Sequence, residues 1–248
     1  MEILNSLIDS VNTDDREIQK VIIGLYTTCV SNSDNTGLSS TLYFNSPGAG
    51  EVHRHFSITG AGDLNSKTGA QLCSYIYSDI IIEASIGMAA LNSFIDVDRE
   101  QCVEVNASSV IRKKGEGRTV AVIGHFPFVK TLKKDVGKLY VFELAPKDSE
   151  DLLPERMPEF LPEADVVAIT GTSLLNHTFH DIMKHVSDNA FVVMLGPSTP
   201  MSGVMFDYGI DMACGSVVVD RQAVENCITQ AVPFKSMRGV SHLALMKK

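Results

Sequence analysis

The second half of the chain alternates short apolar segments with helical patterns, and this alternation constrains the fold more than any other feature. The apolar segments span 119–124, 139–144, 165–170, 190–195 and 211–216, and the clearest helical patterns span 173–186 and 220–230. Short apolar strands separated by helices are typical of a parallel sheet covered on both faces. Because crossovers between parallel strands are right-handed, we expect an α/β fold with a Rossmann-like, doubly wound domain.

The first part of the chain has a different pattern, in which strands come before helices. Residues 3–11 carry apolar side chains at helical spacing, and residues 21–30 are β-branched and aromatic, which predicts a strand. A polar turn over 31–37 leads to a second extended stretch. Residues 68–94 form a helical pattern in two pieces, so this part reads as an α+β unit.

Polar residues mark the helix starts and the domain boundary. The pattern of residues 68–94 breaks near Ser78, and Asp79 is placed to cap its second piece. A later short helix, capped by Asn106 or Ser108, precedes the first apolar segment of the second half. We therefore expect an α+β domain over residues 1–112 and a Rossmann-like domain over residues 113–248.

Charge and cysteine content exclude several classes of protein. The formal charge is −9 and no cationic face is visible, which argues against a nucleic-acid partner. The five cysteines are widely spaced without a CxxC pair, so a disulfide framework is not expected. No signal peptide and no long uncharged apolar run is visible, so we expect a cytoplasmic protein with no membrane partner.

The first apolar segment of the second half ends in a turn made of Gly124, His125, Phe126 and Pro127. A dinucleotide-binding turn needs the spacing G-x-G-x-x-G, and this turn has one glycine followed by bulky rings, so ordinary NAD binding is disfavoured. His125 either contacts a ligand as hydrogen-bonding or acid/base group, or is a loop histidine bonded to backbone. Serine-hydrolase and P-loop signatures are both missing from the sequence.

The next apolar segment ends at Glu143. An acidic residue at this position of a Rossmann-like domain commonly accepts hydrogen bonds from ribose hydroxyls. Glu143 therefore predicts an adenosine site. An equal alternative is that its carboxylate is solvated at the end of the strand and binds no ligand.

The two following segments end in turns rich in hydroxyl groups. They comprise Thr170, Gly171, Thr172 and Asn176, and then Gly196, Pro197, Ser198 and Thr199. Ligands of open parallel sheets bind outside the carboxyl ends of the strands, so we expect these turns to hold a small anionic ligand together. The alternative is local, since Thr172 or Ser173 would also cap a helix.

Metal ligands are less clearly marked. The pairs His53 with His55 and His177 with His180 could each offer two imidazoles, but scattered surface histidines explain them better. Glu83 lies in an apolar helical pattern, where a carboxylate is either paired, functional or on the solvent-facing side. The turns offer hydroxyls, amides and glycines, which suit anionic oxygen groups better than a soft metal.

The motifs VIGHFPF, LYVFELAP, LPEADVVAITGTSLLNHTF, MLGPSTPM and DYGIDMACGSVVVD occur in that order, after the helical segment IIIEASIGMAALNS. Together they resemble a family of unknown function named the putative heavy-metal chelation domain, with its usual N-terminal companion. The resemblance implies an enolase N-terminal-like domain, a Rossmann-like domain and a site in the cleft between them. It adds Gly215 and Asp220 to the site residues named above.

These observations give one leading function and two alternatives. We expect a protein of metal homeostasis that binds a small anionic ligand or metal chelate in the interdomain cleft, with or without turnover, and whose cofactor, if any, is a metal ion or metal chelate. The first alternative is an enzyme that uses an adenosine cofactor such as S-adenosylmethionine, and the second is a ligand-free assembly module. Small residues in 87–94 permit close helix packing, within the chain or in a homo-oligomer.

Overall fold

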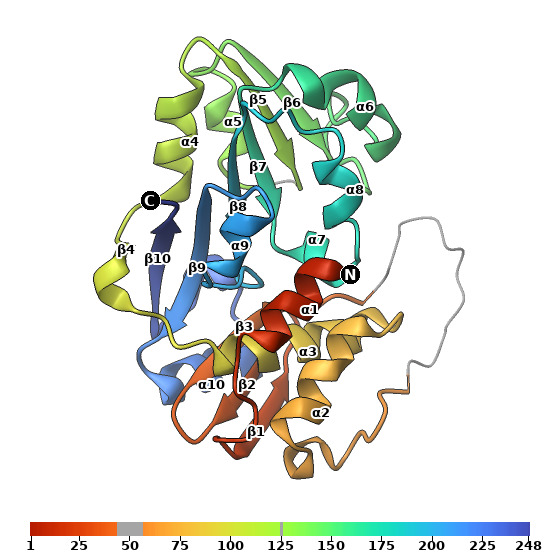
Figure 1. Ribbon diagram of the computed structural model, residues 1–248, viewed down its shortest axis with the longest axis vertical. Helices are drawn as coiled ribbons and strands as arrows, with labels where there is room; N and C mark the ends of the chain where they lie inside the picture. Colours follow the sequence, from red (N-terminus) through yellow and green to blue (C-terminus); the bar gives the residue numbers. More distant parts are fainter. Residues whose placement is uncertain (44–56, 125) are drawn as a thin grey trace.

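The chain folds into two sheets that are joined by helices (Figure 1). The structure is a computed structural model and describes residues 1–43, 57–124 and 126–248. A three-stranded antiparallel sheet comes from the first part of the chain, and a seven-stranded, mostly parallel sheet comes from the second. The predicted α/β class, with an α+β unit before a parallel sheet, is confirmed.

The small sheet consists of β1 (Ile18–Ile23), β2 (Thr27–Asn32) and β3 (Thr36–Ser40). The prediction of one strand over 21–30 is wrong, because the chain reverses at Gly24, whose N–H donates to the Thr27 carbonyl at 3.0 Å. A Cβ at Gly24 would lie 2.5 Å from the side chain of Ile228, so glycine permits both the reversal and the packing beneath it.

The helices of this part are α1 (Glu2–Asp9), α2 (Gly69–Cys73) and α3 (Ile81–Phe94), with the short turns η1 (Leu64–Ser66) and η2 (Ser74–Tyr77). Helix α3 packs on β2 and β3, and α2 packs on α3. The predicted break near Ser78 is confirmed. The predicted cap at Asp79 is wrong, because the N-cap of α3 is Ile80. No side chain caps α3, and the Ser78 hydroxyl accepts from the Ile80 N–H at 3.1 Å just before the helix begins.

Helix α3 is buried on almost every side. It contacts β2, β3, α2 and η2, and the approach is so close that a Cβ at Gly87 would lie 2.1 Å from the backbone nitrogen of Ile76. On the opposite side, a Cβ at Gly37 of β3 would lie 2.2 Å from the carbonyl oxygen of Ala89. The small residues of this segment therefore serve packing within the chain.

Glu83 of α3 is a buried carboxylate with only 4% of its surface exposed. Its Oε1 accepts from the Thr59 N–H at 2.7 Å, and its Oε2 accepts from the Ser78 hydroxyl at 2.6 Å. Burial by itself would raise the pKa of Glu83, but these hydrogen bonds and the nearby Lys67 together lower it below its ordinary value. Of the alternatives for Glu83, the structure selects a paired carboxylate that anchors the segment before α2.

The large sheet has the order β4-β10-β9-β8-β7-β5-β6. Its strands are β4 (Cys102–Val103), β5 (Thr119–Ile123), β6 (Lys138–Phe142), β7 (Val166–Thr170), β8 (Phe191–Leu195), β9 (Met212–Val218) and β10 (Val240–Met246). The predicted apolar segments form the parallel strands β5 to β9. The antiparallel strands β4 and β10 were not predicted, because β4 is too short to carry a pattern and β10 includes Ser241 and His242.

Short helices connect the strands of the large sheet. They are α4 (Ala107–Gly115), α5 (Val129–Leu132), α6 (Met157–Phe160), α7 (Thr172–Leu175), α8 (Phe179–Met183), α9 (Val204–Asp207) and α10 (Arg221–Thr229), with the 3-10 turns η3 (Arg99–Gln101), η4 (Pro154–Arg156), η5 (Leu161–Glu163) and η6 (Phe234–Ser236). Asn106 caps α4 as predicted. The predicted helix over 173–186 is two helices, because the backbone turns at His177, where φ is 60°.

A shared apolar core and several polar contacts join the two sheets. One cluster of buried side chains includes Leu4 and Ile86 together with Val167 and Ile169 of β7. Helix α10 packs on β1 and β2, where Lys20 Nζ lies 2.6 Å from Glu225 Oε2. Strand β4 pairs with β10, and α4 contacts β7 and β8, so residues 102–115 pack with the large sheet. The domain boundary at residue 112 stays a prediction.

Two further properties concern the chain as described. All five cysteines are free thiols. In the segments that the structure describes, none of the helices combines the length and the apolar character needed to cross a bilayer.

Substitution of Gly87 tests the close packing of α3. Gly87→Ala should lower the free energy of unfolding by about 3 kcal/mol, because the backbone of η2 must move to admit a methyl group. Gly203→Ala is the matched control, since a Cβ there meets nothing within 4 Å, and it should change stability little. Urea denaturation of both variants checks this, and equal midpoints would contradict the packing described.

A pH series tests the pairing of Glu83. Because its pKa is lowered by folding, its carboxylate stabilises the fold above the ordinary glutamate pKa of about 4.3, and this stabilisation is lost as the pH falls through the folded value. Glu83→Gln should therefore lower the free energy of unfolding by about 1 to 2 kcal/mol at neutral pH. The difference in this free energy between variant and wild type should become smaller in acid. The exposed Glu17→Gln serves as control, and a difference independent of pH would refute the pairing.

Candidate functional site

Three neighbouring strands of the large sheet end at one cavity of about 740 Å³, which we call the first cavity. Its walls include Gly124 after β5, Glu143 after β6 and Thr170 at the end of β7. Since β6 lies on one side of β5 and β7 on the other, the strand order reverses here. Ligands of open α/β sheets bind at such a reversal. Ser40, the last residue of β3, and Leu42 bring the small sheet to the same cavity.

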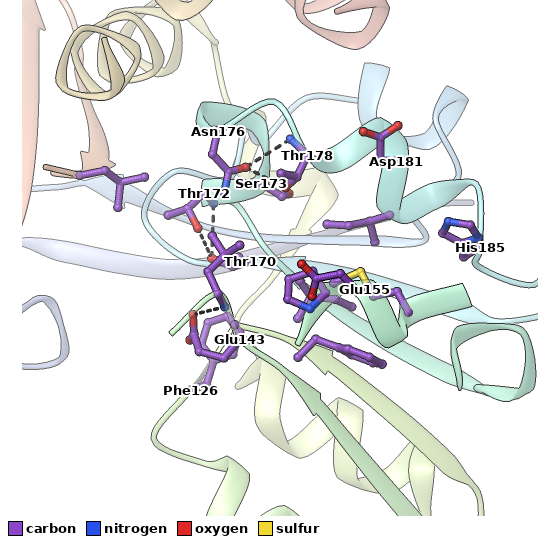
Figure 2. A pocket seen from close by; sticks show the side chains of 18 of the residues that line it. Phe126, Glu143, Glu155, Thr170, Thr172, Ser173, Asn176, Thr178, Asp181 and His185 are labelled. Atoms are coloured by element: carbon purple, nitrogen blue, oxygen red, sulfur yellow. Dashed lines mark hydrogen bonds between the residues drawn. The ribbon is translucent and has the colours of Figure 1, made fainter. Parts of the chain in front are cut away.

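One wall of the first cavity carries hydroxyl and amide groups (Figure 2). The Thr170 and Thr172 hydroxyls are 2.9 Å apart, and the Thr170 oxygen also accepts from the Thr172 N–H at 3.3 Å. Asn176 Oδ1 accepts from the Thr178 hydroxyl at 2.7 Å, which fixes the turn between α7 and α8. These bonds orient the wall, so its donors are held in place before any ligand arrives.

Ser173 belongs to the same wall but differs from its neighbours. Its side chain is 1% exposed, and its hydroxyl has no hydrogen-bond partner among the described residues. A buried hydroxyl without a partner costs about 1 to 3 kcal/mol. Ser173 also lines the first cavity, so this hydroxyl lies beside the space that a ligand would fill.

The mouth of the first cavity is acidic. Glu143, Glu155 and Asp181 line it together with the cation of Lys147 and the imidazole of His185. Lys147 Nζ lies 3.6 Å from Glu143 Oε2, and Glu143 Oε1 accepts from the Leu144 N–H at 3.0 Å. A hydrogen bond from Lys184 lowers the pKa of Asp181, which keeps this exposed carboxylate charged. Lys147 and Lys184 offset two of the three carboxylates, so the balance at the mouth stays negative by about one charge and favours a cationic group over an anion.

A second cavity, also of about 740 Å³, opens between α4, the ends of β8 and β9, and η6. It contains Pro127, Gly196 and Pro197 from the predicted turns, and Gly215. Phe126 lines both cavities. Gly196 has φ of 120°, a backbone conformation that favours glycine, and this conformation directs Pro197 to the cavity.

The predicted site residues therefore separate into groups. Around the first cavity the structure brings together Gly124, Phe126, Glu143, Thr170, Thr172 and Asn176. Gly196 and Pro197 line the second cavity instead, so these two cavities divide the predicted turns between them. That the turns hold a ligand stays a prediction. His125 lies outside the described residues.

Four predicted residues line neither cavity, namely Gly171, Ser198, Thr199 and Asp220. The Ser198 hydroxyl accepts from the Ser40 N–H at 2.9 Å and so links the two sheets. A Cβ at Gly171 would lie 2.8 Å from the Thr199 backbone nitrogen, so glycine permits contact between these turns. Asp220, from the resemblance, caps α10 by accepting from the Ala223 N–H at 3.0 Å.

The histidine pairs give no metal site in the described part of the chain. His177 Nε2 lies 2.9 Å from the Ile76 carbonyl, and His53 and His55 lie outside the described residues. Over residues 1–43, 57–124 and 126–248, no three His, Cys, Asp or Glu side chains are placed to hold a metal ion together.

Several residues of the first cavity were missed in the sequence. Asp181 and His185 are four residues apart within the predicted helix 173–186, so their shared face could have been read from the spacing. Ser40 and Glu155 carried no local signal, because they reach the cavity only through the packing of distant segments.

Comparison with known proteins identifies the family. Two family models, both described as "Putative heavy-metal chelation", match residues 4–95 (DUF4213) and 106–247 (DUF364). An uncharacterized protein of Methanocaldococcus jannaschii, MJ0500, is 27% identical over 165 residues, which are 64% of this chain and 64% of that protein. The chain thus spans about two thirds of the length of this curated relative.

Two solved structures share the fold. A DUF364 protein of unknown function from Desulfitobacterium hafniense has a TM-score of 0.83 and 23% identity, over 99% of this chain and 97% of its own. A second one, from Pyrococcus horikoshii, has a TM-score of 0.79 and 20% identity, over 99% and 98%. The chain therefore belongs to the DUF364 family, described as "Putative heavy-metal chelation", and carries the DUF4213 domain in front of it.

Proposed function

We propose that this protein binds a small metal chelate in the first cavity. The observation that carries this function is the presence, in one cavity, of a wall of hydroxyl and amide groups beside a mouth of carboxylates. A metal chelate presents both matching parts, since its organic arms carry oxygen atoms and its metal centre carries positive charge.

The size and position of the cavity suit such a ligand. Small-molecule sites typically have volumes of about 300 to 1,000 Å³ and mix apolar walls with a few placed polar groups. The first cavity, at about 740 Å³, combines the apolar Ile123, Phe142 and Met157 with the polar wall. It also lies where the strand order of the large sheet reverses.

The two polar parts of the cavity would take different parts of the ligand. Thr172 and Asn176 offer hydrogen bonds to carboxylate or hydroxyl groups of the organic arms. Glu155 and Asp181 attract the metal centre from the mouth. A purely anionic ligand would form hydrogen bonds with the polar wall but would be repelled by the carboxylates at the mouth. We therefore propose a metal chelate in place of a simple anion.

The family description supports a role with metals. Both family models carry the words heavy-metal chelation, while the two solved relatives are described as proteins of unknown function. The adenosine-cofactor alternative receives no such support, and the Glu143 carboxylate already accepts from its neighbour's N–H and lies near Lys147.

Calorimetric titration of the purified protein tests the proposal. The probes are Ni²⁺, Cu²⁺ and Fe³⁺ salts, a set of hydroxycarboxylate and aminocarboxylate chelators, and the complexes of the two. At least one complex should bind more tightly than either its metal or its chelator alone. Chelators that bind equally well with and without metal would contradict the proposal, as would metal salts that bind best alone.

Ser173→Ala separates binding from stability. Removal of a buried hydroxyl without a partner should leave the free energy of unfolding unchanged or raise it by about 1 kcal/mol. The affinity for the chelate should nevertheless fall about tenfold, which corresponds to ~1.4 kcal/mol. Urea denaturation and calorimetry measure the two effects.

Thr27→Val is the matched control. Thr27 of β2 is also buried with a hydroxyl that has no partner among the described residues, but it does not line the cavity. This substitution should affect stability in the same direction and leave chelate affinity unchanged. Equal affinity in Ser173→Ala and in the wild type would place the ligand away from this wall.

A further inference from the structure

The second cavity is separate from the first, because the two lie on opposite faces of the large sheet. Ile111 of α4 packs with Val166 and Ala168 of β7, whereas Ile182 of α8 packs with Val167 and Ile169. Alternate residues of a strand point to opposite faces, so α4 and α8 cover different sides, as Figure 1 shows. Among residues 1–43, 57–124 and 126–248, Phe126 is the one that lines both cavities.

The walls of the second cavity are mainly apolar and partly aromatic. The rings of Phe126 and Phe128 are stacked, with centroids 5.3 Å apart and planes 12° apart, so they form an aromatic pair in the wall. Phe234 contributes a third ring and Leu243 an aliphatic group. Burial raises the pKa of the Cys214 thiol to about 12, so this part of the wall stays neutral at physiological pH. Flat rings pack well against such a wall.

The polar groups of this cavity gather on one side. Ser216 Oγ and His242 Nδ1 are 3.0 Å apart on the paired strands β9 and β10, and the exposed Lys235 lies in the neighbouring turn η6. The carboxylate of Glu104 belongs to the segment before α4 and would repel an anion. A negatively charged head group is therefore favoured toward Lys235 and His242.

We infer that the second cavity is a binding site for a small molecule with an aromatic ring body and one anionic head group. The ring body packs against the stacked aromatic pair of Phe126 and Phe128, and the head group lies beside Lys235. This site is distinct from the chelate site, because it lies on the other face of the sheet and uses other polar residues. It also accounts for the turn of Gly196 and Pro197, which the first cavity does not include.

A fluorescence titration with anilinonaphthalene sulfonate tests the inference. This probe carries aromatic rings and a sulfonate, and its emission rises in apolar surroundings. The folded wild-type protein should show saturable enhancement, and the absence of a saturable signal would overturn the inference. Because such dyes also bind unfolded chains, the melting transition of each variant is measured alongside.

Two variants locate the bound probe. Ala107 lies at the start of α4 and lines the cavity, so Ala107→Phe fills the site and should weaken binding about tenfold or more. Ser109→Phe, on the same helix but exposed and outside the lining, is the matched control and should bind as the wild type does. Lys235→Gln should weaken binding of the probe about threefold, because it removes an exposed ion pair between the lysine and the sulfonate. Lys134→Gln, which lies outside the cavity lining, should leave the affinity unchanged.

The outcomes decide between occupants. Unchanged binding in Ala107→Phe with unchanged binding in Lys235→Gln would overturn the inference, as would equal losses in Ala107→Phe and Ser109→Phe. A wild-type dimer that Ala107→Phe converts to a monomer in size-exclusion chromatography would assign this face to a second copy of the chain and would also overturn it. Loss confined to Ala107→Phe and Lys235→Gln supports the small-molecule site.

Discussion

The close approach of α3 to β3 and η2 is the constraint on which the rest of the structure depends. At Gly37 and Gly87 the backbones come so near that no side chain fits between the elements. Dense contact of this kind leaves little freedom for adjustment, because protein interiors are packed like molecular crystals. The end of β3 and the neighbouring helix α7, which α3 also contacts, are thereby held at the edge of the large sheet. The first cavity owes both of these walls to that packing.

The junction between the two sheets makes the first cavity part of a single folded unit. Side chains from both sheets share one core, and the buried carboxylate of Glu225 reaches across to Lys20. Lys20 itself is half exposed, but its removal would leave the buried Glu225 carboxylate without this partner. Arg221 adds a hydrogen bond to the Asn32 carbonyl at 2.8 Å. We therefore expect the first cavity to keep its shape without a ligand, as most small-molecule sites do.

The parallel strands of the large sheet could be predicted from the sequence, but several turns and the antiparallel strand β10 could not. Strands β5 to β9 were predicted because each is a short apolar run between helical patterns. The reversal at Gly24 and the turn at His177 were missed, since a single glycine or histidine in an otherwise regular pattern gives a weak local signal. Strand β10 was missed because it is partly exposed and polar residues interrupt its apolar pattern.

The same limit applies to the candidate site. The turns that end the strands could be located, but their grouping depends on side-chain packing between distant segments. Ser198 illustrates this, because its hydroxyl faces β3 and not a cavity. Ser40 is the opposite case, because it was not predicted for the site and yet lines the first cavity. Its place depends on how the small sheet packs against the large one, and no local sequence pattern predicts that packing.

The position of the Phe126 ring has a thermodynamic consequence for the two cavities. The half-buried ring forms part of both, so any occupant that rotates it changes the shape of the other cavity as well. Linkage then requires reciprocity, since an occupant of one cavity that alters affinity in the other must experience the same factor in return. A single phenyl group would thus set the sign of the cooperativity between a chelate and an aromatic anion.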